Sequence, residues 1–396
     1  MKDLKEKIRE LSEKNFELVV DIRRHLHQNP ELSFQEYETS KYIASLLESW
    51  GIQFQSGIAN NGISGTIEGK NPQKRVIALR ADIDALPIEE QNEIPFKSKN
   101  KGVMHACGHD VHTSSLLGTL LILNELRDQF EGTIKFIFQP AEEKLPGGAK
   151  QMIEEGVLEN PKPDFIMGQH VYPDLESGKV GFKEGMYMAS TDEIYITVKG
   201  KGGHAAMPHK ITNTVLIASE IIVALQQIPM ELAPKEIPTV LSIGKVEAKG
   251  ATNVIPNEVS MEGTFRTMNE EWRAAAHQKI LDICEALAYG QKASVDVHIK
   301  SGYPVLHNDE TNTLKAADFA KEFLGNEQVV QLETRMTAED FAYYSQKSPS
   351  TFYRLGTSSG NENNYPLHSP NFNIDENSLK TGMGTMAYVS IRYLND

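Results

Sequence analysis

The sequence predicts an α/β protein in which a mixed, largely parallel sheet flanked by helices forms the main domain. Short apolar stretches alternate with helical patterns before residue 188 and after residue 303, which is typical of an α/β sheet. Between them the order changes to β-α-β-β-α-β, that of a ferredoxin-like split unit. A chain of 396 residues is long enough for two cores. We therefore expect a discontinuous main domain, 1–188 and 303–396, and an inserted ferredoxin-like α+β domain, 189–302.

Two helices are expected at the N-terminus. A charged amphipathic pattern runs to about His27 and is stopped by "NP" at residues 29–30, because proline disfavours helical backbone in the residue before it. A second helical pattern, "FQEYETSKYIASLLESW", ends at Gly51. These helices precede the first strand of the predicted sheet.

Polar side chains follow the apolar strands of the main domain. The strands "KRVIALR", "GTIKFIFQ" and "PDFIMGQ" lead directly into "ADIDALP", "PAEE" and "HVYP", and "STFYRLG" precedes a loop with "YPLHSP". Ligands of open α/β sheets bind beyond the carboxyl ends of the strands. We therefore expect one crevice to contain Asp82, Asp84, Glu142, Glu143 and His170.

The inserted domain begins with the alternating strand "DEIYITVKG" and the helix "TNTVLIASEIIVALQQI". Two strands, "TVLSIGKVEA" and "EVSMEGTFRTM", come next, followed by a helix from Asn269 and the strand "ASVDVHIKS". The glycine-rich stretch "KGKGGHAAMPH" lacks the Lys-Ser/Thr pair of a phosphate loop, and its glycines allow a sharp turn that presents His204 outward.

Composition limits the partners. The formal charge of −14 disfavours nucleic acid and anionic membrane surfaces, both of which attract basic faces. The N-terminus has no continuous apolar region like that of a secretory signal, and we expect no apolar run of the ~18 residues that span a bilayer. Two cysteines make no disulfide framework. We expect a cytoplasmic protein that acts on a small molecule.

The stretch "GVMHACGHDVH" (102–112) holds three histidines, an aspartate and Cys107. Taken alone it leaves three roles open for the cysteine. It can be a nucleophile activated by a nearby histidine, a metal ligand together with His109, or a small buried filler.

The adjacent glutamates Glu142 and Glu143 favour metal chemistry. Neighbouring residues in an extended segment point to opposite sides, so one can ligate a metal while the other accepts a proton from water. A metal lowers the pKa of its water from ~16 toward ~7.

His170 and His368 can complete a set of five ligands with Cys107, His109 and Glu143. Five mixed nitrogen, oxygen and sulfur ligands are too many for one tetrahedral structural zinc and suit two metals. Zinc, manganese, cobalt and nickel all accept such donors.

The assembled chain resembles a metallopeptidase-like amidohydrolase family. The family includes hippurate hydrolases, bacterial aminoacylases, N-acetyl-diaminopimelate deacetylases and plant hydrolases of auxin–amino-acid conjugates. The resemblance covers residues 23 to about 375 and rests on nine stretches in family order: "RRHLHQNPELSFQE", "RADIDALPI", "MHACGHDVH", "FQPAEE", "GQHVYPDLESGKVG", "GKGGHAAMPH", "ATNVIPNEVSMEGTFRT", "EDFAYY" and "PLHSPNF".

The resemblance implies an α/β catalytic domain with an inserted lid that often forms a homodimer. It implies that Glu142 is the general base and that Asp82 or Asp84 supports the site, a choice that spacing leaves open. His204 on the lid would stabilise the oxyanion, sometimes across a dimer, and Asn253 with Arg266 would hold the substrate carboxylate. Two divalent ions (Mn, Zn, Ni or Co) would be held by Cys107, His109, Glu143, His170 and His368.

The predicted reaction is hydrolysis of the amide in N-acyl-L-amino acids by a metal-activated water, with Glu142 as general base. Three alternatives are weighed against it. A dipeptidase or carboxypeptidase would use the same two-metal site, a binding protein would have no use for Glu142, and a cysteine hydrolase would attack through Cys107.

Overall fold

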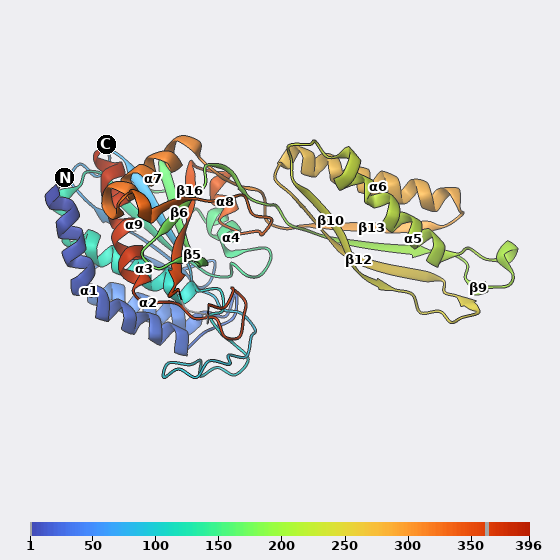
Figure 1. Ribbon diagram of the computed structural model, residues 1–396, viewed down its shortest axis with the longest axis horizontal. Coiled ribbons are helices and arrows are strands. Elements are labelled where there is room, and N and C mark those ends of the chain that lie inside the picture. The colour runs from blue at the N-terminus through green and yellow to red at the C-terminus, as the bar shows by residue number, and fades with distance from the viewer. Residues whose placement is uncertain (1, 361–363) are drawn as a thin grey trace. The chain divides into compact units, whose positions relative to one another are not determined.

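The computed structural model of the chain describes residues 2–360 and 364–396. They divide into two compact units. Unit 1 contains the chain up to Gly185 together with His307–Glu333 and Asp340–Asp396, and unit 2 contains Met186–Leu306 together with Thr334–Glu339. Both ends of the chain belong to unit 1 (Figure 1).

Unit 1 is built on one large sheet. Within the described residues its strands are β1 (Phe54–Ile58), β2 (Gly62–Glu68), β3 (Val76–Asp82), β4 (Thr133–Gln139), β5 (Phe165–Glu176), β6 (Val180–Phe182), β15 (Val329–Gln331) and β16 (Ser350–Ser358). They lie in the order β1-β2-β4-β3-β5-β16-β6-β15. The central strands β4, β3, β5 and β16 are parallel, and antiparallel pairs join β1 to β2, β2 to β4 and β16 to β6. The mixed, largely parallel sheet confirms the predicted fold class.

Helices flank this sheet. They are α1 (Lys2–Gln28), α2 (Tyr37–Ser49), α3 (His109–Glu125), α4 (Gly148–Glu154), α7 (Glu310–Leu324), α8 (Ala342–Ser345) and α9 (Ser378–Asn395), with short 3-10 turns η1 (Arg127–Gln129) and η4 (Asn326–Gln328). Helices α1, α3 and α9 pack against one another, and α3 and α9 also contact strands of the sheet. Helix α3 is therefore buried along almost its whole length, which fixes the position of its first residues.

Unit 2 has a four-stranded antiparallel sheet in the described residues. Its elements are β8 (Asp192–Lys199), α5 (Thr214–Leu225), β10 (Thr239–Glu247), β12 (Glu258–Thr267), α6 (Glu270–Gly290) and β13 (Ser294–Ser301), with a small pair β9 (Gly203–His204) and β11 (Val254–Ile255), a 3-10 turn η2 (Pro208–Lys210) and a π-helical turn η3 (Ile228–Leu232). The order β10-β12-β8-β13 is that of a ferredoxin-like sheet. Short strands β7 (Gly185–Met188) and β14 (Leu306–Asn308) lie where the chain passes between the units.

The helices α5 and α6 cover one face of the unit 2 sheet (Figure 1). The segment Thr214–Leu232 has a mean hydropathy of 1.5 and is long enough to span a membrane, so the expectation that no such run exists was wrong by length and composition. Its side chains Ile217, Ile221 and Leu225 are buried in the unit 2 core, whereas only 28% of the apolar segment as a whole is buried.

Candidate metal centre

The start of helix α3 fixes two of the predicted ligands. Gly108 precedes the helix with a φ of 82°, a left-handed conformation that glycine adopts without strain. A Cβ at this position would lie 2.5 Å from the side chain of Val171 on β5. Any residue other than glycine would therefore clash with Val171. Cys107 and His109 on either side of Gly108 are both buried.

Asp84, just beyond β3, holds His109 in place. Its Oδ1 lies 3.0 Å from Nδ1 of His109, and its Oδ2 accepts hydrogen bonds from Ser33 Oγ at 2.6 Å and from the backbone N–H of Glu143 at 3.0 Å. A carboxylate on one ring nitrogen fixes the orientation of the other nitrogen of a histidine ligand. Of the two aspartates that spacing could not separate, Asp84 is the one bonded to a predicted ligand.

Asp82, the last residue of β3, holds a different histidine. Its carboxylate pairs with Arg80 Nη1 at 2.7 Å and with His112 Nδ1 at 2.6 Å. Nε2 of His112 accepts the backbone N–H of Val171 at 2.9 Å. Because Nε2 accepts, the His112 proton sits on Nδ1, and the neutral ring connects β3 to β5 next to His170.

His170 lies within strand β5, whereas the sequence placed it in a loop beyond a strand end. Its Nδ1 lies 2.8 Å from the backbone oxygen of Val171, so Nδ1 carries the proton and donates it. Nε2 is left with its lone pair and lies 3.5 Å from Sγ of Cys107. The two side chains therefore approach as neighbouring donors to one centre.

The acidic pair leaves the end of β4 through Pro140 and Ala141. Oε2 of Glu142 and Oε1 of Glu143 each lie 4.0 Å from Nε2 of His109. Glu142 is 6% exposed, and the Glu143 side chain is somewhat more open. The predicted base and the predicted ligand thus face the same histidine nitrogen, whereas the sequence placed them on opposite sides. The reason is that Ala141 has a φ of 54° and the chain bends at residues 142–144, so this segment is not extended.

His368 comes from the C-terminal part of the chain. Its backbone has a φ of 64°, and its N–H donates to the backbone oxygen of Ala106 at 2.9 Å, next to Cys107. Its Nε2 lies 3.3 Å from Oε1 of Glu143, and its side chain is 54% exposed. The structure thus brings His368 to the other predicted ligands.

The five predicted ligands and the predicted base Glu142 form overlapping groups whose donor atoms lie within 4.8 Å of one another: Cys107 with His109 and His170, Cys107 with Glu143 and His368, and His109 with Glu142 and Glu143. In the described part of the chain, the buried Nε2 of His109 has no hydrogen-bond partner, although carboxylates surround it. An orphaned buried nitrogen among sulfur, imidazole and carboxylate donors fits divalent ions of the zinc and manganese type.

The charges of the site also favour a cation. Burial alone would lower the pKa of His109, but Asp82 and Asp84 outweigh it and raise this pKa to about 10. His109 must therefore lose its Nε2 proton when it binds a metal, which makes binding pH-dependent. Burial, together with Glu143 and Glu142, raises the pKa of Cys107 well above its usual value. A thiol held protonated in this way is a poor nucleophile, which argues against a cysteine hydrolase.

His204 and Asn253 come together in unit 2. His204 on β9 pairs with Val254 on β11, and the backbone N–H of Ala205 donates to the backbone oxygen of Asn253 at 3.0 Å. Nδ1 of His204 accepts the N–H of Ala206 at 3.1 Å, so the neutral ring carries its proton on Nε2. The side chain of His204 is exposed in this structure.

Arg266 lies on β12 of the four-stranded sheet, at the end away from the β9–β11 pair. Strand β12 pairs Glu258 with Lys199, near the β9–β11 pair, and Phe265 with Asp192 at the opposite end. The eight residue-to-residue steps from Glu258 to Arg266 span roughly 26 Å at the usual strand rise. Within one chain, Arg266 and Asn253 therefore do not meet, although both were predicted to hold the substrate carboxylate.

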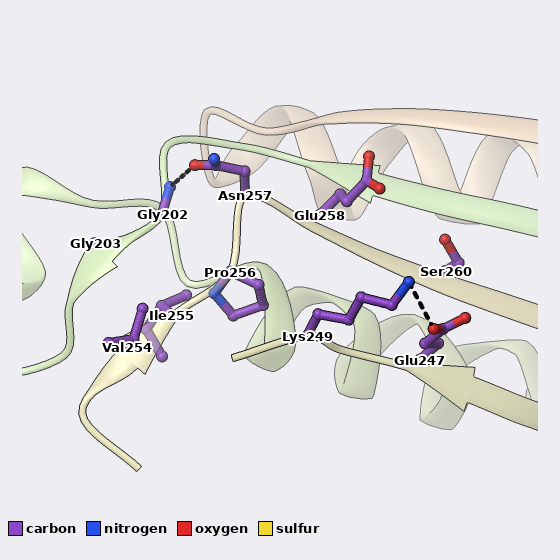
Figure 2. A pocket seen from close by; sticks show the side chains of 10 residues that line it. All are labelled: Gly202, Gly203, Glu247, Lys249, Val254, Ile255, Pro256, Asn257, Glu258 and Ser260. Atoms are coloured by element: carbon purple, nitrogen blue, oxygen red, sulfur yellow. Dashed lines mark hydrogen bonds and ion pairs between the residues drawn. The ribbon is translucent and has the colours of Figure 1, made fainter. Parts of the chain in front are cut away.

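An open hollow of about 710 Å³ lies beside the β9–β11 pair. Figure 2 shows its residues, with Asn257 accepting from the N–H of Gly202 and Lys249 paired to Glu247. Residues of unit 2 alone form this hollow, and it contains none of the donor groups described above.

Several residues that shape the site were not singled out from the sequence. Ser33 and Glu36 lie in "PELSFQE", and Asp340, in "EDFAYY", accepts from Arg80 Nη2 at 2.8 Å and from the backbone N–H of Ala149 at 3.0 Å. Both stretches were among those that carry the family resemblance. Their place in these stretches was the signal that could have identified these residues. Their residue type alone could not, because a buried carboxylate in a polar stretch has the same sequence pattern as a surface carboxylate.

A set of mostly buried sulfur, imidazole and carboxylate donors gathers near the carboxyl ends of parallel strands, beside a second buried carboxylate, and this arrangement is typical of a metallohydrolase. The chain belongs to Peptidase family M20/M25/M40, whose model matches residues 78–391. It is 41% identical over 374 residues to the N-acetylcysteine deacetylase of Bacillus subtilis (strain 168), covering 94% of this chain and 96% of that protein. It is 38% identical over 399 residues to thermostable carboxypeptidase 2 of Saccharolobus solfataricus, covering 99% and 100%.

Among solved structures, the chain resembles a dinuclear metal binding peptidase of the M20 family from Bacillus subtilis. The TM-score is 0.84 at 38% sequence identity, covering 96% of this chain and 99% of that one. These comparisons confirm the resemblance and the prediction of a metal-binding hydrolase.

Proposed function

We propose that the protein hydrolyses the amide bond of N-acyl-L-amino acids to a carboxylate and a free amino acid. The observation that carries this proposal is the placement of Glu142 and Glu143 at equal distances, 4.0 Å, from Nε2 of His109. A protein that only bound metal would need ligands, whereas a second carboxylate beside them suits proton transfer. The N-acetylcysteine deacetylase relative supports an amide substrate.

The proposed ligands of two divalent ions are Cys107, His109, Glu143, His170 and His368. When bound, the ions polarise the scissile carbonyl and lower the pKa of water. Glu142 accepts the proton of the attacking water at its carboxylate and delivers it to the nitrogen of the leaving amine. Asp84 keeps the Nδ1 proton of His109, so Nε2 is free to ligate.

The remaining proposed roles belong to unit 2. The Nε2 proton of His204 donates to the oxyanion, and Asn253 and Arg266 bind the substrate carboxylate. The inserted segment 189–302 acts as the lid. Manganese, zinc, nickel and cobalt all accept this ligand set. We place the protein in the cytoplasm, because a cysteine ligand has to stay reduced.

The carboxypeptidase relative favours one alternative, cleavage of a peptide bond by the same site. Amine release should be measured over a panel of N-acetyl and N-benzoyl amino acids and of dipeptides, with metal analysis of the purified protein. We expect the highest kcat/KM on an N-acyl amino acid. A preference for dipeptides would replace the proposal by a peptidase, and no release from any member would contradict both.

We also propose that unit 2 mediates a homodimer. Asn253 and Arg266 lie too far apart in one chain to hold one carboxylate, so a second copy must supply one of them. Unit 2 also exposes apolar side chains, with Val223 73% and Met230 79% exposed, and β10 lies at an edge of its sheet. Exposed apolar side chains and an open strand edge are features of protein interfaces.

Mixing two inactive variants tests the shared site. His204→Ala and Arg266→Ala should each be nearly inactive, because each removes a group from every site. If one copy supplies His204 and the other Arg266, half of the dimers formed after mixing are hybrids with one intact site, so activity returns to about one quarter of wild type. The measurement is hydrolysis after joint refolding of equal amounts. Activity that stays at the level of the two parents would show that each site belongs to a single chain.

A further inference from the structure

A buried glutamate outside the predicted site connects three separate segments. Glu36 is 0% exposed and lies just before helix α2. Its Oε1 accepts the backbone N–H of Phe34 at 3.0 Å and that of Ala141 at 2.8 Å, and its Oε2 accepts from Asn61 Nδ2 at 2.9 Å. A buried carboxylate is costly unless it is hydrogen-bonded, and the proposed reaction does not use this one.

Ala141 is the most informative of the three partners, because it directly precedes the proposed base. It is fully buried and has a φ of 54°, a left-handed conformation that non-glycine residues rarely adopt. Two hydrogen bonds hold it there: its N–H donates to Glu36, and its oxygen accepts from the N–H of Gly148 at 3.0 Å. Without Glu36 this N–H would be buried and unpaired.

The backbone on the other side of Glu142 is held by a second carboxylate. The N–H of Glu143 donates to Asp84, the residue that also orients His109. Glu36 and Asp84 therefore hold residues 141 and 143, on either side of the base. The direction in which Glu142 and Glu143 leave the end of β4 depends on both contacts.

We propose that Glu36 is a positioning residue that holds the turn at 140–143 in the conformation that presents Glu142 as base and Glu143 as ligand. The inference rests on the proposed roles of these two glutamates. Its first test is therefore metal binding, which needs no substrate.

The test compares Glu36→Ala with Glu36→Gln by calorimetric titration of chelator-treated protein with Mn²⁺. Glu36→Ala removes the hydrogen bond to the N–H of Ala141 and should weaken Mn²⁺ binding by about 10–100-fold, the usual effect of removing a group that orients metal ligands. Glutamine keeps an oxygen that accepts from Ala141, and Asn61 can turn its amide to accept in return, so Glu36→Gln should bind nearly as wild type. Glu38→Ala, at an exposed glutamate in the first turn of helix α2, is the matched control and should leave Mn²⁺ binding unchanged.

A second variant and thermal melts together separate positioning from loss of overall stability. Glycine adopts a left-handed φ without strain, so adding Ala141→Gly to Glu36→Ala should restore part of the Mn²⁺ affinity. Glycine at this φ also relieves strain and so raises overall stability, and for this reason the thermal melt of each variant is measured beside the titration. A positioning role requires the Mn²⁺ affinity of Glu36→Ala to fall at a temperature at which the variant is fully folded. If Glu36→Ala does not fold, Glu36→Asp replaces it, because its shorter carboxylate cannot reach both Phe34 and Ala141.

On an N-acetyl amino acid, Glu36→Ala should lower kcat with little change in KM. The proposal is overturned if Glu36→Ala and Glu36→Asp bind Mn²⁺ as wild type does, if Glu36→Gln loses as much affinity as Glu36→Ala, or if Ala141→Gly restores nothing. If the wild-type protein hydrolyses no N-acyl amino acid, the proposed function fails, while the Mn²⁺ titrations still decide the role of Glu36.

Discussion

Replacement of Glu142 by glutamine is expected to lower kcat for an N-acetyl amino acid by about 10²–10⁴-fold, the usual contribution of a positioned general base. The amide has the size of the carboxylate but cannot accept the proton of the attacking water. The proposed ligands are unchanged, so the variant should retain its metal. The measurement is steady-state amine release together with the metal content of the same sample.

The matched control is Glu154→Gln, at an exposed glutamate on helix α4, which should leave kcat unchanged. Full hydrolysis by Glu142→Gln with its metal retained would contradict the role of Glu142 as base. Loss of both activity and metal would instead indicate that Glu142 is itself a ligand.

Removal of the metal by a chelator is expected to lower hydrolysis by roughly 10³-fold or more, because polarisation of a carbonyl by a metal supplies several kcal/mol. Activity should return on addition of Mn²⁺ or Zn²⁺. The metal-free protein should also melt at a lower temperature, since ions that bind only the folded chain stabilise it by mass action. Activity assays and thermal melts before and after treatment measure both effects.

Thiol alkylation provides the control for this experiment. Cys107 is 7% exposed and is a proposed metal ligand, so its sulfur is shielded in the metal-loaded protein and alkylation of that protein should leave activity intact. Activity that survives the chelator but is lost on alkylation of the metal-free protein would point to a cysteine hydrolase and contradict the metal mechanism.

The sequence predicted the sheet and the approximate location of the site. Apolar strands with polar residues at their ends are a local signal, and the carboxyl ends of parallel strands share one edge, so placing Asp84, Glu142 and Glu143 together required no long-range information. The order β-α-β-β-α-β of unit 2 could likewise be read from alternating patterns along the chain.

The partners within the site could not be read in this way. Asp82 and Asp84 are two residues apart and share one face of an extended segment, so spacing gives them the same orientation. Only the packing of α3 against the sheet decides that His112 pairs with Asp82 and His109 with Asp84. The sequence placed His170 beyond a strand, because the apolar stretch "PDFIMGQ" ends directly before it. In the structure, pairing with β16 extends β5 through His170.

The chain order of the ligands has a consequence for biosynthesis. His170 and His368 are 198 residues apart (368 − 170), and the sheet position beside His170 is taken by β16, which is made late. At the usual rates of translation, roughly 10–40 s separate the emergence of these two histidines from the ribosome. In this interval the nascent chain contains the main segment of unit 2 but not His368, one of the five proposed ligands. Under the proposed ligand set, metal loading would be completed only after residue 368 emerges, and a product that stops before that residue would lack one of the proposed ligands.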